Sequence, residues 1–225
     1  MNIVLPFIIA LGSCFLLTPI VIKLAYKFHV VDDPKKRSHP ATLHKIPIAR
    51  AGGLPLFLAF LVAAVVALPF SQKLLGIILG GLVVTVVGLL DDKFDLDKKY
   101  KIGGQVLAAL IVVASGIGIN FITNPLYILS GADSVLPSVI RLDSLRVFFD
   151  FFGTHSIVVW ADLFAIFWIV WVINMVNFST GVDGQMPGIA FVVFLVLFSA
   201  SLRFYPFDES QLIVIQLASV GVGIT

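Results

Sequence analysis

Two adjacent carboxylates, Asp91 and Asp92, follow a long apolar run and are the residues whose chemistry is easiest to predict. If that run is a helix, both lie at its C-terminus, where the helix dipole disfavours negative charge unless something positive binds. Carboxylate oxygens are preferred ligands of Mg²⁺, which also leaves room for water and substrate phosphates. The pair therefore predicts either a Mg²⁺ site or a basic partner. The nearby Asp95 and Asp97 are instead expected to pair with lysines in a solvated turn.

A basic segment from Asp32 to Pro55 contains the pair Gly52 and Gly53, where another apolar run begins. Glycines at a helix N-terminus let backbone N–H groups approach an anion, and the helix dipole there favours negative charge. We therefore expect a phosphate to bind near this pair. The basic side chains closest to the pair are expected to contact that phosphate: His44, Lys45 and Arg50. The earlier basic residues are better explained as a juxtamembrane loop that contacts lipid headgroups.

A third polar segment stands at the end of a later apolar run. Asn174 and Asn177 are three residues apart and would share one face of a helix. Asp183 follows in a glycine-rich turn. Together these side chains could line a polar site at a membrane surface. Each of them alone would also fit a helix end that has no role in chemistry.

The elements that position these residues are long apolar segments. Hydrophobic residues make up 59% of the chain and charged residues 12%, and the mean hydropathy is +1.07. These values lie far outside those of soluble domains, and a membrane-spanning helix needs about 20 apolar residues. Seven segments approach this requirement: 3–22, 51–70, 74–90, 104–122, 163–176, 188–202 and 211–225. We expect an all-α integral membrane protein, a polytopic transmembrane helix bundle that forms one domain over residues 1–225.

The distribution of basic residues predicts the orientation of these spans. Eleven of the fifteen Lys and Arg residues fall in or beside 23–50 and 93–101. Because cytoplasmic loops carry the excess of Lys and Arg, these segments face the cytoplasm and the N-terminus lies outside. The cytoplasmic loops are then 23–50, 91–103 and 177–187, so all three polar groups share one membrane face. The longest outer loop, 123–160, contains short apolar runs that predict a small hairpin or a surface helix.

In this order, the three segments resemble the polyprenyl-phosphate N-acetylhexosamine-1-phosphate transferase family of integral membrane enzymes. The matching stretches are HKIPIARAGG from His44 to Gly53, GLLDD from Gly88 to Asp92, and NMVNFSTGVDG from Asn174 to Gly184. The resemblance covers essentially the whole chain. The first stretch is more similar to the N-acetylglucosamine-1-phosphate branch than to the muramoyl-pentapeptide branch.

The resemblance implies an activity that uses Mg²⁺, or Mn²⁺ as an alternative. Members of the family transfer a sugar 1-phosphate from a UDP-N-acetylhexosamine to a polyprenyl phosphate such as undecaprenyl phosphate, and release UMP. This is the first membrane step of cell-wall or surface polysaccharide synthesis, on the cytoplasmic side of the bacterial plasma membrane. By resemblance, Asp91 and Asp92 are catalytic and serve the metal or the lipid phosphate. The residues implied in substrate binding are His44, Lys45, Arg50, Gly52, Gly53, Asn174, Asn177 and Asp183.

Two departures from the family pattern qualify this expectation. Thr180 stands where the family has the first Asp of its third motif. The family also continues past its seventh span to a Gly-Asp-x-Gly motif and a His-rich loop, which implies a further metal ligand beyond Thr225. We therefore expect a C-terminally truncated member that is inactive alone.

Other functions stay open at this point. Asp91, Asp92 and Asp95 also match the Asp-Asp-x-x-Asp pattern of intramembrane prenyltransferases, but no second Asp-rich cluster appears in the sequence. A membrane scaffold, or an inactive fragment, is the alternative without catalysis. The sequence does not decide whether the chain forms a homodimer. The net charge of +2 says little about partners, and no nucleic acid is expected.

Overall fold

The computed structural model of the chain describes residues 3–32, 47–130, 137–150, 154–178, 184–204 and 208–225. The seven apolar segments are helical, with these bounds: α1 (Val4–Lys27), α2 (Gly53–Ala67), α3 (Gln72–Phe94), α4 (Lys98–Ala114), α6 (Val159–Phe178), α7 (Gln185–Ser201) and α8 (Glu209–Ile224). The 3₁₀ turn Leu202–Phe204 extends α7. The largest difference from expectation is α4, which begins and ends earlier than the apolar run 104–122.

Four stretches are long and apolar enough to cross a membrane: Val4–Lys27, Gln72–Phe94, Val159–Phe178 and Gln185–Phe204. Little of their surface is covered by the rest of the chain, and Phe15 on α1 is 79% exposed. Apolar surface of this extent requires lipid as its solvent. The chain is therefore a multi-pass membrane protein. The apolar helices α2 and α8 are shorter, so the expected number of seven spans stays a prediction.

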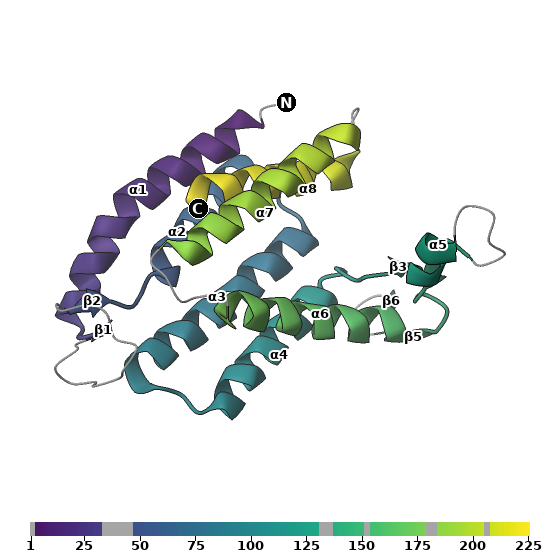
Figure 1. Ribbon diagram of the computed structural model, residues 1–225, viewed down its shortest axis with the longest axis horizontal. Helices are drawn as coiled ribbons and strands as arrows, with labels where there is room; N and C mark the ends of the chain where they lie inside the picture. Colours follow the sequence, from purple (N-terminus) through teal and green to yellow (C-terminus); the bar gives the residue numbers. More distant parts are fainter. Residues whose placement is uncertain (1–2, 33–46, 131–136, 151–153, 179–183, 205–207) are drawn as a thin grey trace.

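The helices run in alternating directions through the bundle (Figure 1). One end, here called the motif end, holds the C-termini of α1, α3 and α6 and the N-termini of α2, α4 and α7. The main helix contacts are α1 with α2 and α8, α7 with α8, α3 with α2 and α4, and α4 with α6. The described residues of all three sequence motifs therefore lie at the same end of the bundle. This arrangement agrees with the shared membrane face expected from the sequence.

Small residues let the helices pack closely. Ala10, Ala63 and Ala64 are fully buried together with Val220 of α8 in one apolar cluster. On the other side of the bundle, α3 approaches α4 through glycines. A Cβ atom built on Gly80 would lie 2.7 Å from Val112 Cγ2 and 3.2 Å from the Ala108 carbonyl oxygen.

This close approach predicts that Gly80→Ala destabilises the folded chain. The added methyl group must push α4 away, and such overpacking costs about 1–3 kcal/mol. Gly88→Ala is the matched control on the same helix, because nothing lies within 4 Å of its Cβ position. Removing a helix-interior glycine there should be neutral or should stabilise by up to about 1 kcal/mol. Thermal unfolding of both variants in one detergent measures the difference, and equal midpoints would contradict the proposed contact.

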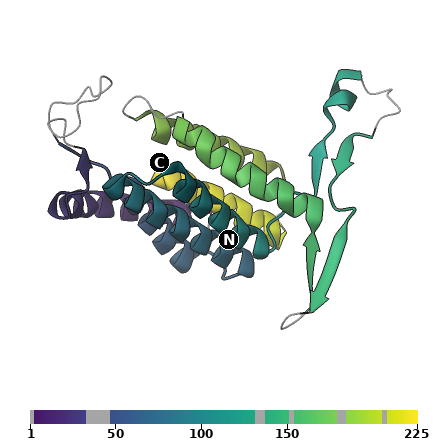
Figure 2. The ribbon, with the colours of Figure 1, turned by 90° about the horizontal axis from the view of Figure 1, so that it is seen from below.

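Short strands lie at both ends of the bundle. At the motif end, β1 (Val31–Asp32) pairs antiparallel with β2 (Ile48–Ala49) between α1 and α2. The segment expected as an outer loop contains the helix α5 (Pro125–Ser130) and two antiparallel pairs. These pairs are β3 (Phe121–Thr123) with β4 (Val139–Arg141), and β5 (Arg146–Asp150) with β6 (Thr154–Val158). The strand region stands across the end of the bundle opposite to the motif end (Figure 2). Both the hairpin and the surface helix considered from the sequence are therefore present.

An ion pair holds the connection between β4 and β5. Arg141 Nη2 and Nε donate to the two Asp143 carboxylate oxygens at 2.6 and 2.9 Å. These hydrogen bonds lower the pKa of Asp143 to about 2. Because the pKa is lowered on folding, the stabilisation from this pair is complete above about pH 4 and is lost as the pH falls through about 2.

Candidate functional site

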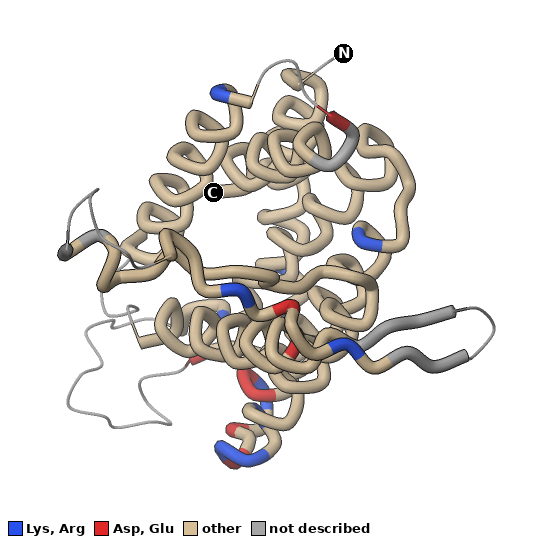
Figure 3. The backbone as a smooth tube through the Cα atoms, turned by 90° about the vertical axis from the view of Figure 1, so that its right-hand side faces the viewer, with Lys and Arg blue, Asp and Glu red and all other residues tan. Residues whose placement is uncertain are grey.

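The carboxylate pair lies where a tight turn joins α3 to α4. Asp95 ends α3 in a left-handed conformation (φ 51°), and its N–H donates to the Asp91 carbonyl oxygen at 2.9 Å. The Asp97 carboxylate then caps α4 by accepting from the Lys99 N–H at 2.9 Å. This turn folds the first turn of α4 back beside the last turn of α3. Acidic and basic segments consequently gather at the bottom of the view in Figure 3, where the two helices meet.

Both carboxylates have basic partners. Lys101 Nζ lies 2.8 Å from Asp91 Oδ1, and Arg50 Nε lies 3.7 Å from Asp92 Oδ1. The side chains of Asp91, Asp92 and Arg50 are each 26–27% exposed. At about 4 Å a pair of opposite charges gains about 1 kcal/mol in water and about 4 kcal/mol at an effective dielectric constant near 20. The cost of placing two carboxylates at a helix C-terminus is therefore offset by basic partners from two other segments.

The oxygen donors of Asp91 and Asp92 also fit a hard cation such as Mg²⁺. Among the described residues, no group of three or more His, Cys, Asp or Glu side chains is arranged to hold a metal ion. A cation bound between these two carboxylates would therefore need further oxygen ligands, which substrate phosphates and water can supply.

Local contacts place Arg50 opposite the carboxylate pair. The Arg50 N–H donates to the Val30 carbonyl oxygen at 3.1 Å and thereby extends the β1–β2 pairing. The Tyr26 hydroxyl of α1 donates to the Pro47 carbonyl oxygen at 2.7 Å. The Arg50 Nη1 group also lies 3.7 Å from Asp95 Oδ1, so one guanidinium bridges two carboxylates. Arg50 therefore lies beside the carboxylate pair, and its role in substrate binding stays a prediction.

Gly52 and Gly53 are separated from Arg50 by Ala51; Gly52 is the N-cap residue of α2 and Gly53 is its first residue. Nothing lies within 4 Å of a Cβ atom built on either glycine. The two glycines are therefore not crowded by other side chains, and they lie at the same end of the bundle as Asp92. His44, Lys45 and Asp183, which were also predicted as site residues, lie outside the described residues.

The last turns of α6 carry Asn174 and Asn177. The Asn174 amide nitrogen donates to Gln105 Oε1 at 2.7 Å and to the Val170 carbonyl oxygen at 2.8 Å. Gln105 lies one helical turn after Lys101 on α4. Helix α4 therefore connects the carboxylate pair on one side with α6 on the other. Asn177 is exposed near the end of α6.

Two residues of this arrangement were missed by the sequence analysis. The sequence analysis expects the lysines after Asp92 to lie in a solvated turn, and it gives Gln105 no role. Asp97 is a typical helix N-cap residue, and a helix that begins there places Lys101 and Gln105 on one face. That signal was hidden because the helix was expected to begin with the apolar run at residue 104.

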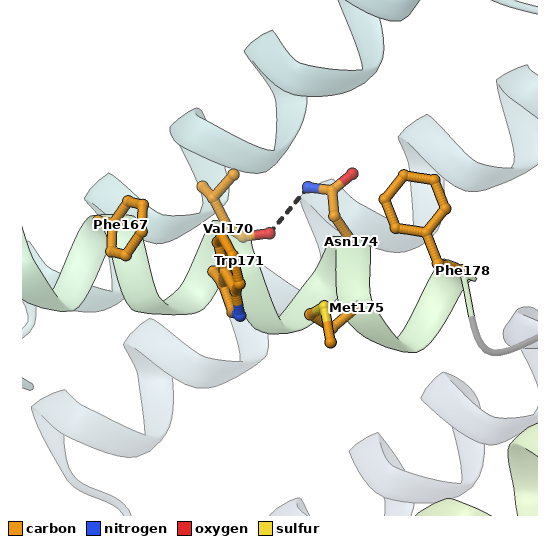
Figure 4. Close-up of a pocket in the computed structure, with 6 residues that line it drawn as sticks. All are labelled: Phe167, Val170, Trp171, Asn174, Met175 and Phe178. Atoms are coloured by element: carbon orange, nitrogen blue, oxygen red, sulfur yellow. Dashed lines mark hydrogen bonds between the residues drawn. The ribbon is translucent and has the colours of Figure 1, made fainter.

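An apolar groove of about 270 Å³ runs along α6 beside this arrangement. Its lining residues are Phe167, Val170, Trp171, Asn174, Met175 and Phe178. Figure 4 shows their side chains along the helix, with a hydrogen bond from Asn174 to Val170. All of these residues belong to α6 and all but Asn174 are apolar, so the groove is an apolar surface of this helix that ends near the motif end of the bundle.

Comparison with known proteins bears on this site. Residues 74–225 match the model of glycosyl transferase family 4. The probable undecaprenyl-phosphate N-acetylglucosaminyl 1-phosphate transferase of Bacillus subtilis is 26% identical over 193 residues, which cover 85% of this chain and 46% of that protein. The decaprenyl-phosphate N-acetylglucosaminephosphotransferase of Mycobacterium leprae is 28% identical over 189 residues, or 80% of this chain and 41% of that protein.

A phospho-N-acetylmuramoyl-pentapeptide-transferase of Gemmatimonas aurantiaca is 30% identical over 128 residues, or 50% of this chain and 30% of that protein. The chain thus spans less than half the length of these relatives. No solved structure matches it significantly. The family resemblance drawn from the three motifs is confirmed by these matches.

Proposed function

Because the chain belongs to glycosyl transferase family 4, we propose that it carries the acceptor-side part of a polyprenyl-phosphate N-acetylglucosamine-1-phosphate transferase. The observation that carries this proposal is the pair Asp91 and Asp92, held between Lys101 and Arg50 at the motif end. This pair lies on α3, and the family match begins within that helix, at residue 74. The names of the relatives supply the acceptor class, a polyprenyl phosphate, and the sugar, N-acetylglucosamine.

In the proposed reaction, an oxygen of the lipid phosphate attacks the sugar-bearing phosphorus of UDP-N-acetylglucosamine. The new P–O bond forms as the bond between that phosphorus and the oxygen bridging to UMP breaks, and UMP leaves with the electron pair. The products are a polyprenyl diphosphate sugar and UMP. Such phosphoryl transfers depend mainly on positioning and on electrostatic stabilisation.

The charges at the motif end suit this chemistry. Two phosphorylated anions repel one another by about 1 kcal/mol per pair of unit charges at 4 Å in water, and by more in a drier site. Lys101 and Arg50 provide fixed positive charge against that repulsion. Asp91 and Asp92 would hold a Mg²⁺ ion, which supplies further positive charge to the phosphate oxygens when bound. Arg50 is 3.7 Å from both carboxylates that it bridges, so it can turn toward a phosphate without losing a short hydrogen bond.

The groove on α6 supports a lipid acceptor. Its aromatic and apolar lining would hold isoprene units. Asn174 is the polar residue in this lining, and its hydrogen bond to Gln105 connects the groove to α4, which packs against α3 and its carboxylate pair. An intramembrane prenyltransferase is not favoured, because the family match is to sugar transferases. In the proposal the bundle crosses a bacterial plasma membrane seven times, with the motif end in the cytoplasm.

The proposed orientation can be tested by labelling. In a Cys14→Ala background, a cysteine in place of the exposed Lys99 should react only with reagents that enter the cytoplasm. A cysteine in place of Ser144, in the strand region at the other end, should react with an impermeant maleimide added outside. Labelling of position 99 from outside intact cells would contradict the orientation. The Cys14→Ala parent, which has no cysteine, is the control for background labelling.

The proposed activity is tested by UMP release from UDP-N-acetylglucosamine in proteoliposomes that contain undecaprenyl phosphate and Mg²⁺. Because the relatives are about twice as long as this chain, the assay is run on the chain alone and on a fusion. The fusion joins Thr225 to the remaining C-terminal part of the Bacillus subtilis relative. Lipid-dependent UMP release by the fusion supports the proposal. Release that does not depend on the lipid, or none at all from a folded fusion, would refute it.

A further inference from the structure

The orientation of the Asn174 amide is fixed by its neighbours. Its nitrogen lies 2.8 Å from the Val170 carbonyl oxygen, which can only accept a hydrogen bond. The atom at that distance must therefore be the NH₂ group and not the amide oxygen. The second N–H of the same NH₂ group points to Gln105 Oε1 at 2.7 Å. Both N–H groups of Asn174 are thus used within the protein.

The amide oxygen is the part of Asn174 that remains for a ligand. Within the described part of the chain, no hydrogen bond to Asn174 Oδ1 is found. The residue lines the groove on α6, and its partner Gln105 stands one turn from Lys101, which contacts Asp91. The oxygen is therefore an unused hydrogen-bond acceptor on a residue that lines the groove and contacts α4 through Gln105. An acceptor repels phosphate oxygens and attracts hydroxyl or amide N–H groups.

We propose that Gln105 is a positioning residue of the site, which holds Asn174 so that its amide oxygen accepts a hydrogen bond from a hydroxyl or acetamido N–H group of the sugar nucleotide. This inference rests on the proposed function. It adds that Asn174 is the hydrogen-bond acceptor in the contact and the sugar nucleotide is the donor. Without the Gln105 oxygen, one N–H of Asn174 loses its acceptor, and the amide is held only by its hydrogen bond to the Val170 carbonyl oxygen. The contact to the sugar nucleotide then weakens, while the groups that act on the phosphates stay in place.

The test is a set of variants of the fusion, assayed for UMP release at varied UDP-N-acetylglucosamine. Gln105→Met keeps the size of the side chain but removes the acceptor, and should raise KM for the sugar nucleotide about three- to tenfold while kcat stays within about twofold. Gln105→Glu keeps an oxygen that can accept from Asn174 and should restore KM to within about twofold. In an Asn174→Ala background, adding Gln105→Met should change KM no further, because the two residues act through one contact.

Gln72→Met is the matched control, since Gln72 is exposed at the opposite end of the bundle and should leave KM and kcat unchanged. An unchanged KM in Gln105→Met, or an additive effect in the double variant, would overturn the inference while the proposed function stands. A shift in the Mg²⁺ concentration for half-maximal activity, at unchanged KM, would overturn it too, since Asn174 would then bind the cation. If the wild-type fusion releases no UMP, the proposed function fails and this inference fails with it.

Discussion

Asp91→Asn and Asp92→Asn should each lower kcat for UMP release by the fusion about a thousandfold. Each change removes one oriented negative charge from the end of α3, where the proposal places the metal and the lipid phosphate. Removing one preorganised electrostatic group from an active site commonly costs about a hundred- to a thousandfold in rate, and loss of a metal ligand belongs at the upper end. The measurement is single-turnover UMP release at saturating Mg²⁺ and UDP-N-acetylglucosamine.

Stability separates this effect from misfolding. Carboxylates at a helix C-terminus oppose the helix dipole, and their partly exposed ion pairs are worth about 0–1 kcal/mol each. Thermal midpoints of the two variants should therefore stay close to that of the wild type while activity is lost. Asp97→Asn is the matched control in the same turn, because Asn caps a helix about as well as Asp. Near-normal turnover in both Asp91→Asn and Asp92→Asn would remove the pair from the mechanism.

Much of this fold could be predicted because lipid is its solvent. Long apolar runs have few alternatives to helices in a membrane, so every predicted segment is helical. The predicted helix boundaries are wrong where a helix and its apolar run do not begin or end at the same residues. Helix α4 begins with a charged turn at Lys98, and α6 begins at Val159, before the expected residue 163. Both helices begin before the part that their apolar run marks, and α4 also ends at Ala114, inside its run, whose last residues belong to β3.

The site could be predicted only in part. Asp91 and Asp92 carry a local signal, because adjacent carboxylates at the end of an apolar run are costly without compensation. Arg50 is expected near a phosphate from its place beside the glycine pair, but its contact with Asp92 carries no local signal, because the two residues lie more than forty positions apart and meet through the β1–β2 pairing. The contact between Gln105 and Asn174 likewise depends on how α4 packs against α6. Such long-range pairs depend on how the helices pack, and the spacing of residues along the sequence does not predict that packing.

Lys101→Met should lower kcat/KM for UMP release about a hundredfold. Its ammonium group lies 2.8 Å from Asp91 Oδ1 and is 38% exposed, so a phosphate can approach it without the removal of other side chains. If Lys101 only compensated Asp91, its loss would cost at most about 1 kcal/mol of stability and little activity. If it also stabilises charge on the transferred phosphate, the loss is that of one oriented electrostatic group. The size of the kinetic effect therefore decides between a structural and a functional ion pair.

Two further variants complete this test. Lys99→Met is the control, because Lys99 lies in the same first turn of α4 but is exposed; it should keep kcat/KM within about twofold. Lys101→Arg keeps the charge but replaces a compact ammonium group by a planar fork, so it should recover part of the lost activity. Equal kcat/KM for Lys101→Met and Lys99→Met would leave Lys101 as a counter-ion of Asp91 alone. The positive charge on the phosphates would then have to come from Arg50 and the metal.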